Sequence, residues 1–236
     1  MEDKFLILTL VIASLGFILW FTFSSSLLLP VRFQVLYDAN PPYVNRIFRR
    51  RVVGALIYGV IPLFIIKCTN LLDKPLLGDL GISIQWNHKV SMWLLFLIPL
   101  VLITSLLTTN KTSNLEQFPE VRVRFWRPQI FIWSTIWWVI YLTAYEFFYR
   151  GLLFQSLRFQ ATDEVAVVAC TAIYSLAHYF KRNRVSFFAI LYGALSCYMV
   201  IDTGSILPGL ILHIVNALSV EYLSLKHHPE MYLIKT

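Results

Sequence analysis

The chain has 236 residues, of which 58% are hydrophobic and 14% are charged, and its mean hydropathy is +0.66. A soluble domain is about half apolar and about a quarter charged, so this composition excludes an ordinary soluble protein and predicts an integral multi-pass membrane protein. The formal net charge is +7. In a soluble protein that excess of basic residues would favour nucleic acid. Here basic loops orient helices and meet anionic lipid, so the predicted partner is the lipid bilayer and no nucleic acid is expected.

The first apolar segment begins almost at the N-terminus, in MEDKFLILTLVIASLGFILWF. Its flank is weakly charged and no clear small-x-small cleavage site follows, so we interpret it as a retained span rather than a signal peptide. About 20 apolar residues are needed to cross a bilayer. Seven segments come close to that length: Phe5–Leu29, Val52–Cys68, Val90–Leu107, Ile130–Leu157, Val165–Phe180, Val185–Ile201 and Ile206–Leu223.

These segments are expected to be helices, because backbone polar groups cannot go unsatisfied in lipid. The predicted fold class is therefore all-α, a polytopic membrane helix bundle of about seven transmembrane helices. The two longest breaks, Pro30–Arg51 and Leu71–Lys89, have no apolar core of their own. We predict that residues 1–236 form a single integral membrane domain, in which helices four to seven (residues 130–223) carry the functional motifs.

Positive charges gather in the odd-numbered loops. They are Arg46, Arg49, Arg50 and Arg51 in the first loop, Lys111, Arg122, Arg124 and Arg127 in the third, and Lys181, Arg182 and Arg184 in the fifth. Cytoplasmic loops carry an excess of Lys and Arg, so the C-terminus is predicted to be cytoplasmic and the N-terminus outside. The compact length suits a bacterial plasma membrane, with an internal eukaryotic membrane as the alternative.

The three cysteines have no C-x-x-C spacing, and their number is odd. Cys170 and Cys197 lie within apolar runs and are expected to act as small buried hydrophobic residues. Neither a disulfide framework nor a cysteine-based metal site is predicted.

Polar side chains interrupt the apolar helices near the end of the chain: Glu146 and Arg150 in YEFFYRG, His178 in YSLAHYF, and His213 in PGLILHIVN, followed by Asn216. Ionisable residues in hydrocarbon are costly and usually line a functional cavity. Counted from the predicted outer turns, Glu146 and His178 lie about 22 to 25 Å along their helices and His213 about 14 Å along its own. The three are thus within reach of one layer. Arg150 shares a helix face with Glu146, and Asn216 shares one with His213.

Two imidazoles, a carboxylate and an amide are the groups needed to activate a water molecule and stabilise an oxyanion. Each also has an ordinary structural explanation. A lone histidine in a membrane helix can be an interhelical hydrogen-bond partner, and Glu146 with Arg150 can be a structural ion pair. Their matched depth favours a shared functional site.

The three polar stretches resemble the motifs of the CPBP family, the CAAX-protease and bacteriocin-processing intramembrane proteases, also called the Abi family. That family carries Glu-Glu-x-x-x-Arg, Phe-x-x-x-His and His-x-x-x-Asn/Asp on three membrane helices. Residues 145–153 are similar to the first motif, residues 174–178 to the second, and residues 193–213, with the amide that follows them, to the third. The likeness covers about the last hundred residues of the chain.

The resemblance implies an intramembrane endopeptidase whose substrate is a peptide or protein at the membrane. In the family, the first Glu of the pair and the second-motif His activate a water molecule, and the third-motif His and Asn stabilise the oxyanion. The endopeptidase hypothesis for this chain assigns the base to Glu146, the second Glu of the pair, its partner to His178, the oxyanion donors to His213 and Asn216, and an orienting role to Arg150. The sequence establishes no cofactor. The family is often described as a metalloprotease family, which makes zinc a candidate, with Glu146, His178 and His213 as its ligands.

Two positions depart from the family pattern. Tyr145 stands where the family has its first Glu, and a step of one residue turns a side chain by about 100° around a helix. A phenol is a poor base at neutral pH, so Tyr145 is assigned a structural or orienting role. Asn216 follows His213 by three residues rather than four, which still leaves it on the same face.

The Tyr145 departure leaves a second class of function open. A catalytically inactive relative would keep the fold and act as a membrane accessory or immunity protein. A small transporter or proton relay would also place Glu and His in its helices. The sequence shows no inverted repeat and no pair of broken helices, which counts against transport.

Overall fold

The computed structural model describes residues 2–24, 42–69, 84–178 and 183–234. In chain order its elements are α1 (Glu2–Ser24), α2 (Pro42–Ala55), the π-helical turn η1 (Leu56–Val60), α3 (Ile61–Thr69), α4 (His88–Thr108), α5 (Thr112–Leu115), β1 (Phe125–Trp126), α6 (Pro128–Glu146), the π-helical turn η2 (Phe147–Leu153), α7 (Phe154–Arg158), α8 (Asp163–Leu176), α9 (Asn183–Thr203), α10 (Leu207–His227) and β2 (Tyr232–Leu233). The predicted all-α membrane bundle is confirmed. Of the predicted loops Pro30–Arg51 and Leu71–Lys89, residues 30–41 and 71–83 lie outside the described residues, as do the predicted loop charges Lys181 and Arg182. Arg184, predicted in the fifth loop, lies in α9.

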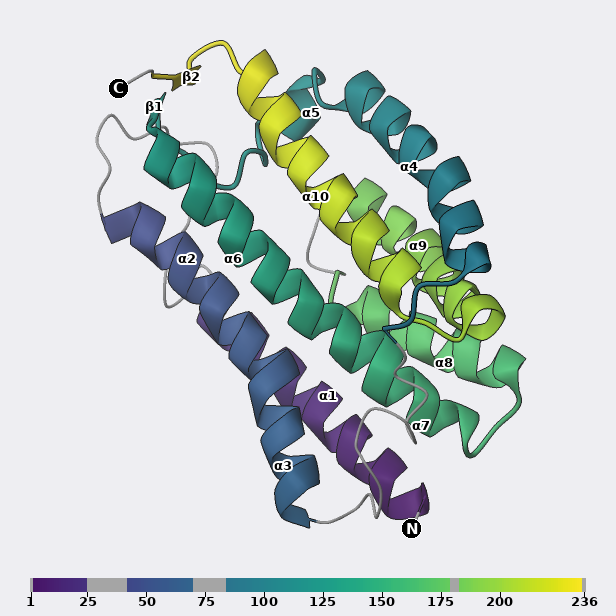
Figure 1. Cartoon of the computed structure of the whole chain (residues 1–236). Coiled ribbons are helices and arrows are strands. Elements are labelled where there is room, and N and C mark those ends of the chain that lie inside the picture. The colour runs from purple at the N-terminus through teal and green to yellow at the C-terminus, as the bar shows by residue number, and fades with distance from the viewer. Residues whose placement is uncertain (1, 25–41, 70–83, 179–182, 235–236) are drawn as a thin grey trace.

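The bundle is arranged around α6, the helix that ends at Glu146. Figure 1 shows α6 lying between α2 and α10, with α4 against the far side of α10. Helices α8 and α9 pack on each other, and both contact η2, while α1 covers η2 and α7. The elements that carry the predicted polar residues therefore meet around the π-helical turn that continues α6.

Four continuous helices among the described residues are long and apolar enough to cross a membrane: Val44–Cys68, His88–Thr108, Pro128–Arg158 and Leu207–His227. Lys4–Trp20 and Phe187–Thr203 are apolar but shorter. The predicted fifth span corresponds to α8, whose first turn contains Asp163 and Glu164. Helix α4 exposes large apolar side chains such as Phe96 and Leu107, the pattern expected of a surface that faces lipid.

The largest buried cluster surrounds η2. Phe148 and Tyr149 are almost completely buried, and their rings lie 5.5 and 5.7 Å from the ring of Tyr58 in η1. Gly59 permits this approach, because a Cβ atom there would lie 3.0 Å from the Cβ of Ala144 in α6. Small residues of this kind allow close packing of membrane helices. The turn after Glu146 is thus held in a rigid setting.

The structure corrects one expectation about the first basic run. The prediction placed Arg46, Arg49, Arg50 and Arg51 in the first loop, but α2 begins at Pro42 and contains all four, and the Arg51 side chain is buried. The reason lies in the helical spacing: Arg51 continues a buried stripe formed by Val44, Ile47, Gly54 and Tyr58. Only a partnered guanidinium can be accommodated there.

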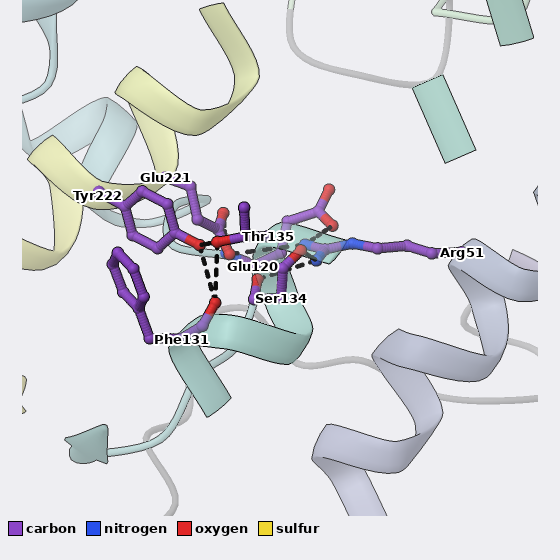
Figure 2. A network of polar contacts seen from close by, with 7 residues as sticks. All are labelled: Arg51, Glu120, Phe131, Ser134, Thr135, Glu221 and Tyr222. Carbon is purple, nitrogen blue, oxygen red and sulfur yellow. Dashed lines mark hydrogen bonds and ion pairs between the residues drawn. The ribbon is translucent and has the colours of Figure 1, made fainter. Parts of the chain in front are cut away.

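A buried ionic cluster supplies those partners (Figure 2). Nη1 of Arg51 donates to the backbone oxygen and the Oγ of Ser134 in α6, at 3.1 and 2.9 Å. Nη2 lies 3.2 Å from Oε2 of Glu120 and 3.5 Å from Oε1 of Glu221 in α10. The backbone N–H of Glu120 donates to Glu221 Oε2 at 3.0 Å, and the guanidinium lies 4.1 Å from the ring centre of Trp138. One arginine of α2 thereby ties α6 and α10 together.

Replacing Arg51 is expected to destabilise the bundle strongly, because Glu120 and Glu221 would stay buried without their shared cation. We predict that Arg51→Gln lowers the free energy of unfolding by about 3 to 5 kcal/mol, measured by thermal or denaturant unfolding in detergent micelles. The matched control is Arg49→Gln, two residues earlier in the same helix, whose side chain is exposed and whose loss should be nearly neutral. Equal free energies of unfolding for the two variants would contradict this role of Arg51.

Candidate active site

Glu146 occupies the junction between α6 and η2. It is the last residue of α6, and its side chain is completely buried. The following seven residues form a π-helical turn, a rare form of helix that is frequent at functional sites. This turn brings Arg150 back towards Glu146, with Nε of Arg150 3.4 Å from Glu146 Oε2. A fully buried carboxylate is thus paired within its own helix.

The other carboxylate oxygen of Glu146 meets His213 of α10. The distance from Glu146 Oε1 to His213 Nδ1 is 2.6 Å, which is short for a nitrogen–oxygen hydrogen bond. Helix α10 starts after a turn in which Gly204 adopts φ = 66° and Ser205 Oγ accepts a hydrogen bond from the Leu207 N–H. That entry fixes the height of His213 along the bundle. Two of the residues predicted from the sequence to converge are therefore in direct contact.

Arg150 is held by more than its carboxylate partner. Its Nε also donates to Ser196 Oγ in α9 at 2.7 Å, and its guanidinium carbon lies 4.1 Å from the ring centre of Tyr174 in α8. A buried cation is tolerated when an opposite charge, a hydrogen bond and an aromatic face replace its water. Arg150 consequently links η2 to both α8 and α9.

His178 packs against aromatic rings next to this ion pair. Its Nδ1 is 3.1 Å from the carbonyl oxygen of Tyr174, and its ring is half-buried against the Tyr174 ring. The ring of Tyr145 stands edge-on to both imidazoles, with centroid distances of 6.3 Å to His178 and 6.1 Å to His213. The residue that replaces the first Glu of the family motif therefore fills the space next to the two histidines.

Asn216 is placed differently from the other predicted site residues. It lies one turn beyond His213 on α10, and its side chain is exposed. A step of three residues covers about 300° of the helical circle, so the amide is rotated by about 60° from the imidazole. The structure brings Glu146, Arg150 and His213 together, connects His178 to them through Tyr145, and leaves Asn216 at the rim.

Tyr192 of α9 is a site residue that the sequence did not reveal. Its hydroxyl donates to the carbonyl oxygen of Gly209 at 2.6 Å and lies 3.4 Å from Glu146 Oε1. Its ring centre is 5.0 Å from that of His213. A tyrosine in an apolar run is common, and only the neighbouring Gly193 and Ala194, which permit close helix approach, could have drawn attention to this stretch.

Three metal ligands do not gather here. Within the described residues no group of three His, Cys, Asp or Glu side chains is positioned to hold a metal ion. His213 already directs Nδ1 at Glu146, and His178 directs Nδ1 at a backbone carbonyl. The side chains, as arranged, do not form the zinc site implied by the resemblance.

Residues 126–219 match the family of type II CAAX prenyl endopeptidases described as Rce1-like. This segment is similar to that family. It contains all the polar residues of the three motifs, and the helices before Trp126 lie outside it. No curated protein and no solved structure matches the chain. The family is a protease family, which supports the predicted hydrolase activity and a membrane location.

Arg150 should be more important for folding than an ordinary arginine, because its loss would leave the buried carboxylate of Glu146 without its cation. We predict that Arg150→Met lowers the free energy of unfolding by about 3 to 5 kcal/mol. The double variant Glu146→Gln with Arg150→Met should lose clearly less than the sum of the two single variants. Thermal unfolding of the four proteins in the same detergent measures this coupling, and strictly additive losses would contradict it.

Proposed function

We propose that the chain is an intramembrane endopeptidase that hydrolyses a peptide bond of a peptide or protein at the membrane. The observation that carries the proposal is the 2.6 Å contact between Glu146 Oε1 and His213 Nδ1 inside the helix bundle. A carboxylate joined to an imidazole is an arrangement that activates water for acyl transfer. Its position within the Rce1-like segment agrees with a CAAX-type substrate.

The surroundings of the pair support the same chemistry. Electrostatic stabilisation of an oxyanion is strongest where water is excluded, and Glu146 and Arg150 are both completely buried. His178 is half-buried and Asn216 is exposed, so both are more accessible than Glu146 and Arg150. We assign them to the side of the site that meets the scissile carbonyl.

We further propose a bacterial plasma-membrane location with a cytoplasmic C-terminus.

One observation favours a second candidate, an inactive relative that binds a partner. Tyr145 replaces the first Glu of the motif, and its ring packs against both imidazoles. If that ring also blocks the approach of a peptide, the chain would retain the fold as a membrane accessory protein. The two functions differ in whether any peptide bond is cut.

The test is cleavage of an internally quenched, farnesylated CAAX peptide by the full chain in proteoliposomes. We expect the wild type to cleave it and Glu146→Gln, His178→Ala and His213→Ala each to lose at least about 10²-fold in kcat/KM, the usual contribution of acid–base groups. His227→Ala is the matched control. It removes a second histidine of α10, at the far end of the helix against Thr109, and should cleave like the wild type.

Two results would count against the endopeptidase. Wild-type protein that binds the peptide without cutting it would favour the accessory protein. Cleavage that persists unchanged in all three site variants would show that this cluster is not the catalytic centre.

A further inference from the structure

The two residues of the Glu146–His213 pair differ in which of their atoms remain available to a water molecule or a substrate. A carboxylate only accepts hydrogen bonds, so Nδ1 of His213 carries the hydrogen of their contact. In the neutral ring the second nitrogen, Nε2, is then left with its lone pair. Glu146 differs: Oε1 is taken by His213, and Oε2 is completely buried 3.4 Å from the Arg150 Nε, where it pairs with the charge without a hydrogen bond.

Burial separates the two residues further. The side chain of Glu146 is 0% exposed, whereas that of His213 is 16% exposed. A water molecule and a substrate carbonyl can therefore approach the imidazole more readily than the carboxylate. A base must be within hydrogen-bond reach of the proton that it removes.

The neighbours of Glu146 hold it as an anion in one orientation. Arg150 provides a buried positive charge, and Tyr192 provides a hydroxyl 3.4 Å from Oε1. The Arg150 charge on one oxygen and the His213 ring on the other hold the carboxylate in one orientation. This environment suits a group that orients an imidazole better than one that takes up a proton in each cycle.

We propose that His213, through Nε2, is the general base of the reaction, and that Glu146 is a positioning residue fixed by Arg150 and Tyr192. The proposal rests on the endopeptidase function. It replaces the hypothesis drawn from the sequence, in which Glu146 is the base and His213 an oxyanion donor. It also accounts for Tyr145, because a site whose base is an imidazole does not need the first carboxylate of the motif. The Tyr145 ring instead limits the rotation of the His213 ring, against which it packs edge-on.

The step balances without a co-reactant. Nε2 of His213 accepts a proton from water while the water oxygen bonds to the scissile carbonyl carbon, and the carbonyl electron pair moves to its oxygen. When that pair returns, the carbon–nitrogen bond breaks and the leaving nitrogen takes the proton from Nε2. The products are an acid and an amine, and Glu146 stays ionised throughout.

The order of residual activities tests this assignment of roles. With the farnesylated CAAX peptide in proteoliposomes, kcat of Glu146→Gln should remain about tenfold or more above that of His213→Ala, since removing an orienting carboxylate costs less than removing the base. His213→Gln, which keeps an amide near the carboxylate, should be as inactive as His213→Ala. Unfolding in detergent confirms that each variant is folded.

Chemical rescue distinguishes a catalytic histidine from a structural one, because added imidazole restores kcat only where the missing ring took part in the reaction. Imidazole added to His213→Ala should raise its kcat at least tenfold and leave Glu146→Gln unchanged. Failure of imidazole to raise His213→Ala, or a Glu146→Gln activity at or below that of His213→Ala, would overturn this assignment of roles while leaving the endopeptidase intact. A wild type that cuts nothing would overturn both.

Tyr192 provides an independent check. Tyr192→Phe removes a hydroxyl that donates to the Gly209 carbonyl at 2.6 Å and lies 3.4 Å from Glu146 Oε1, and it should lower kcat about fivefold with KM unchanged, the range for losing one neutral hydrogen bond that positions the site. The matched control is Tyr198→Phe in the same helix, whose side chain is exposed and should be dispensable. A kcat for Tyr192→Phe within twofold of the wild type would remove Tyr192 from the mechanism.

Discussion

A buried carboxylate in a membrane helix bundle needs an opposite charge and polar groups beside it, and this constraint organises the structure around Glu146. The carboxylate has no exposure to water, so its charge is compatible with the fold only because Arg150, His213 and Tyr192 surround it. These partners come from η2, α10 and α9. The same contacts that make the charge tolerable therefore also assemble three helical elements into one site.

A second ionic cluster repeats this principle nearer the other end of α6 and α10. Ser134 and Glu146 lie twelve residues apart on the continuous α6, or about 18 Å, and His213 and Glu221 lie eight residues apart on α10, or about 12 Å. Arg51 connects Ser134 with Glu221, just as Glu146 connects with His213. The two helices are thus fixed to each other at two heights. The N-terminal part of the chain, outside the Rce1-like segment, contributes to the geometry of the site in this way.

The fold and the centre of the site followed from simple patterns in the sequence. Apolar length predicted the helical segments, and matched depth predicted that Glu146 and His213 would approach one another. Arg51 was misassigned because it ends a run of basic residues, although its spacing from Val44, Ile47 and Tyr58 marked the buried face of α2. Charge composition and helical periodicity gave opposite indications there, and periodicity was right.

Other features of the site could not be predicted from the amino-acid sequence. A π-helical turn at Phe147–Leu153 depends on tertiary packing, and nothing in FFYRGLL distinguishes it from an α-helix. Tyr192 acts through a hydroxyl whose target, Gly209, is determined only when α9 and α10 pack. The prediction that Asn216 shares the face of His213 neglected the rotation between residues three apart, which is sufficient to leave the amide exposed.

The hydrogen bond between Glu146 and His213 can be observed directly by nuclear magnetic resonance of the full chain with ¹⁵N-labelled histidine in lipid nanodiscs. The account predicts a strongly downfield Nδ1–H proton that is absent in His213→Gln and shifts far upfield in Glu146→Gln. A His213 Nδ1–H signal with the same position in Glu146→Gln as in the wild type, or a deprotonated Nδ1, would contradict it.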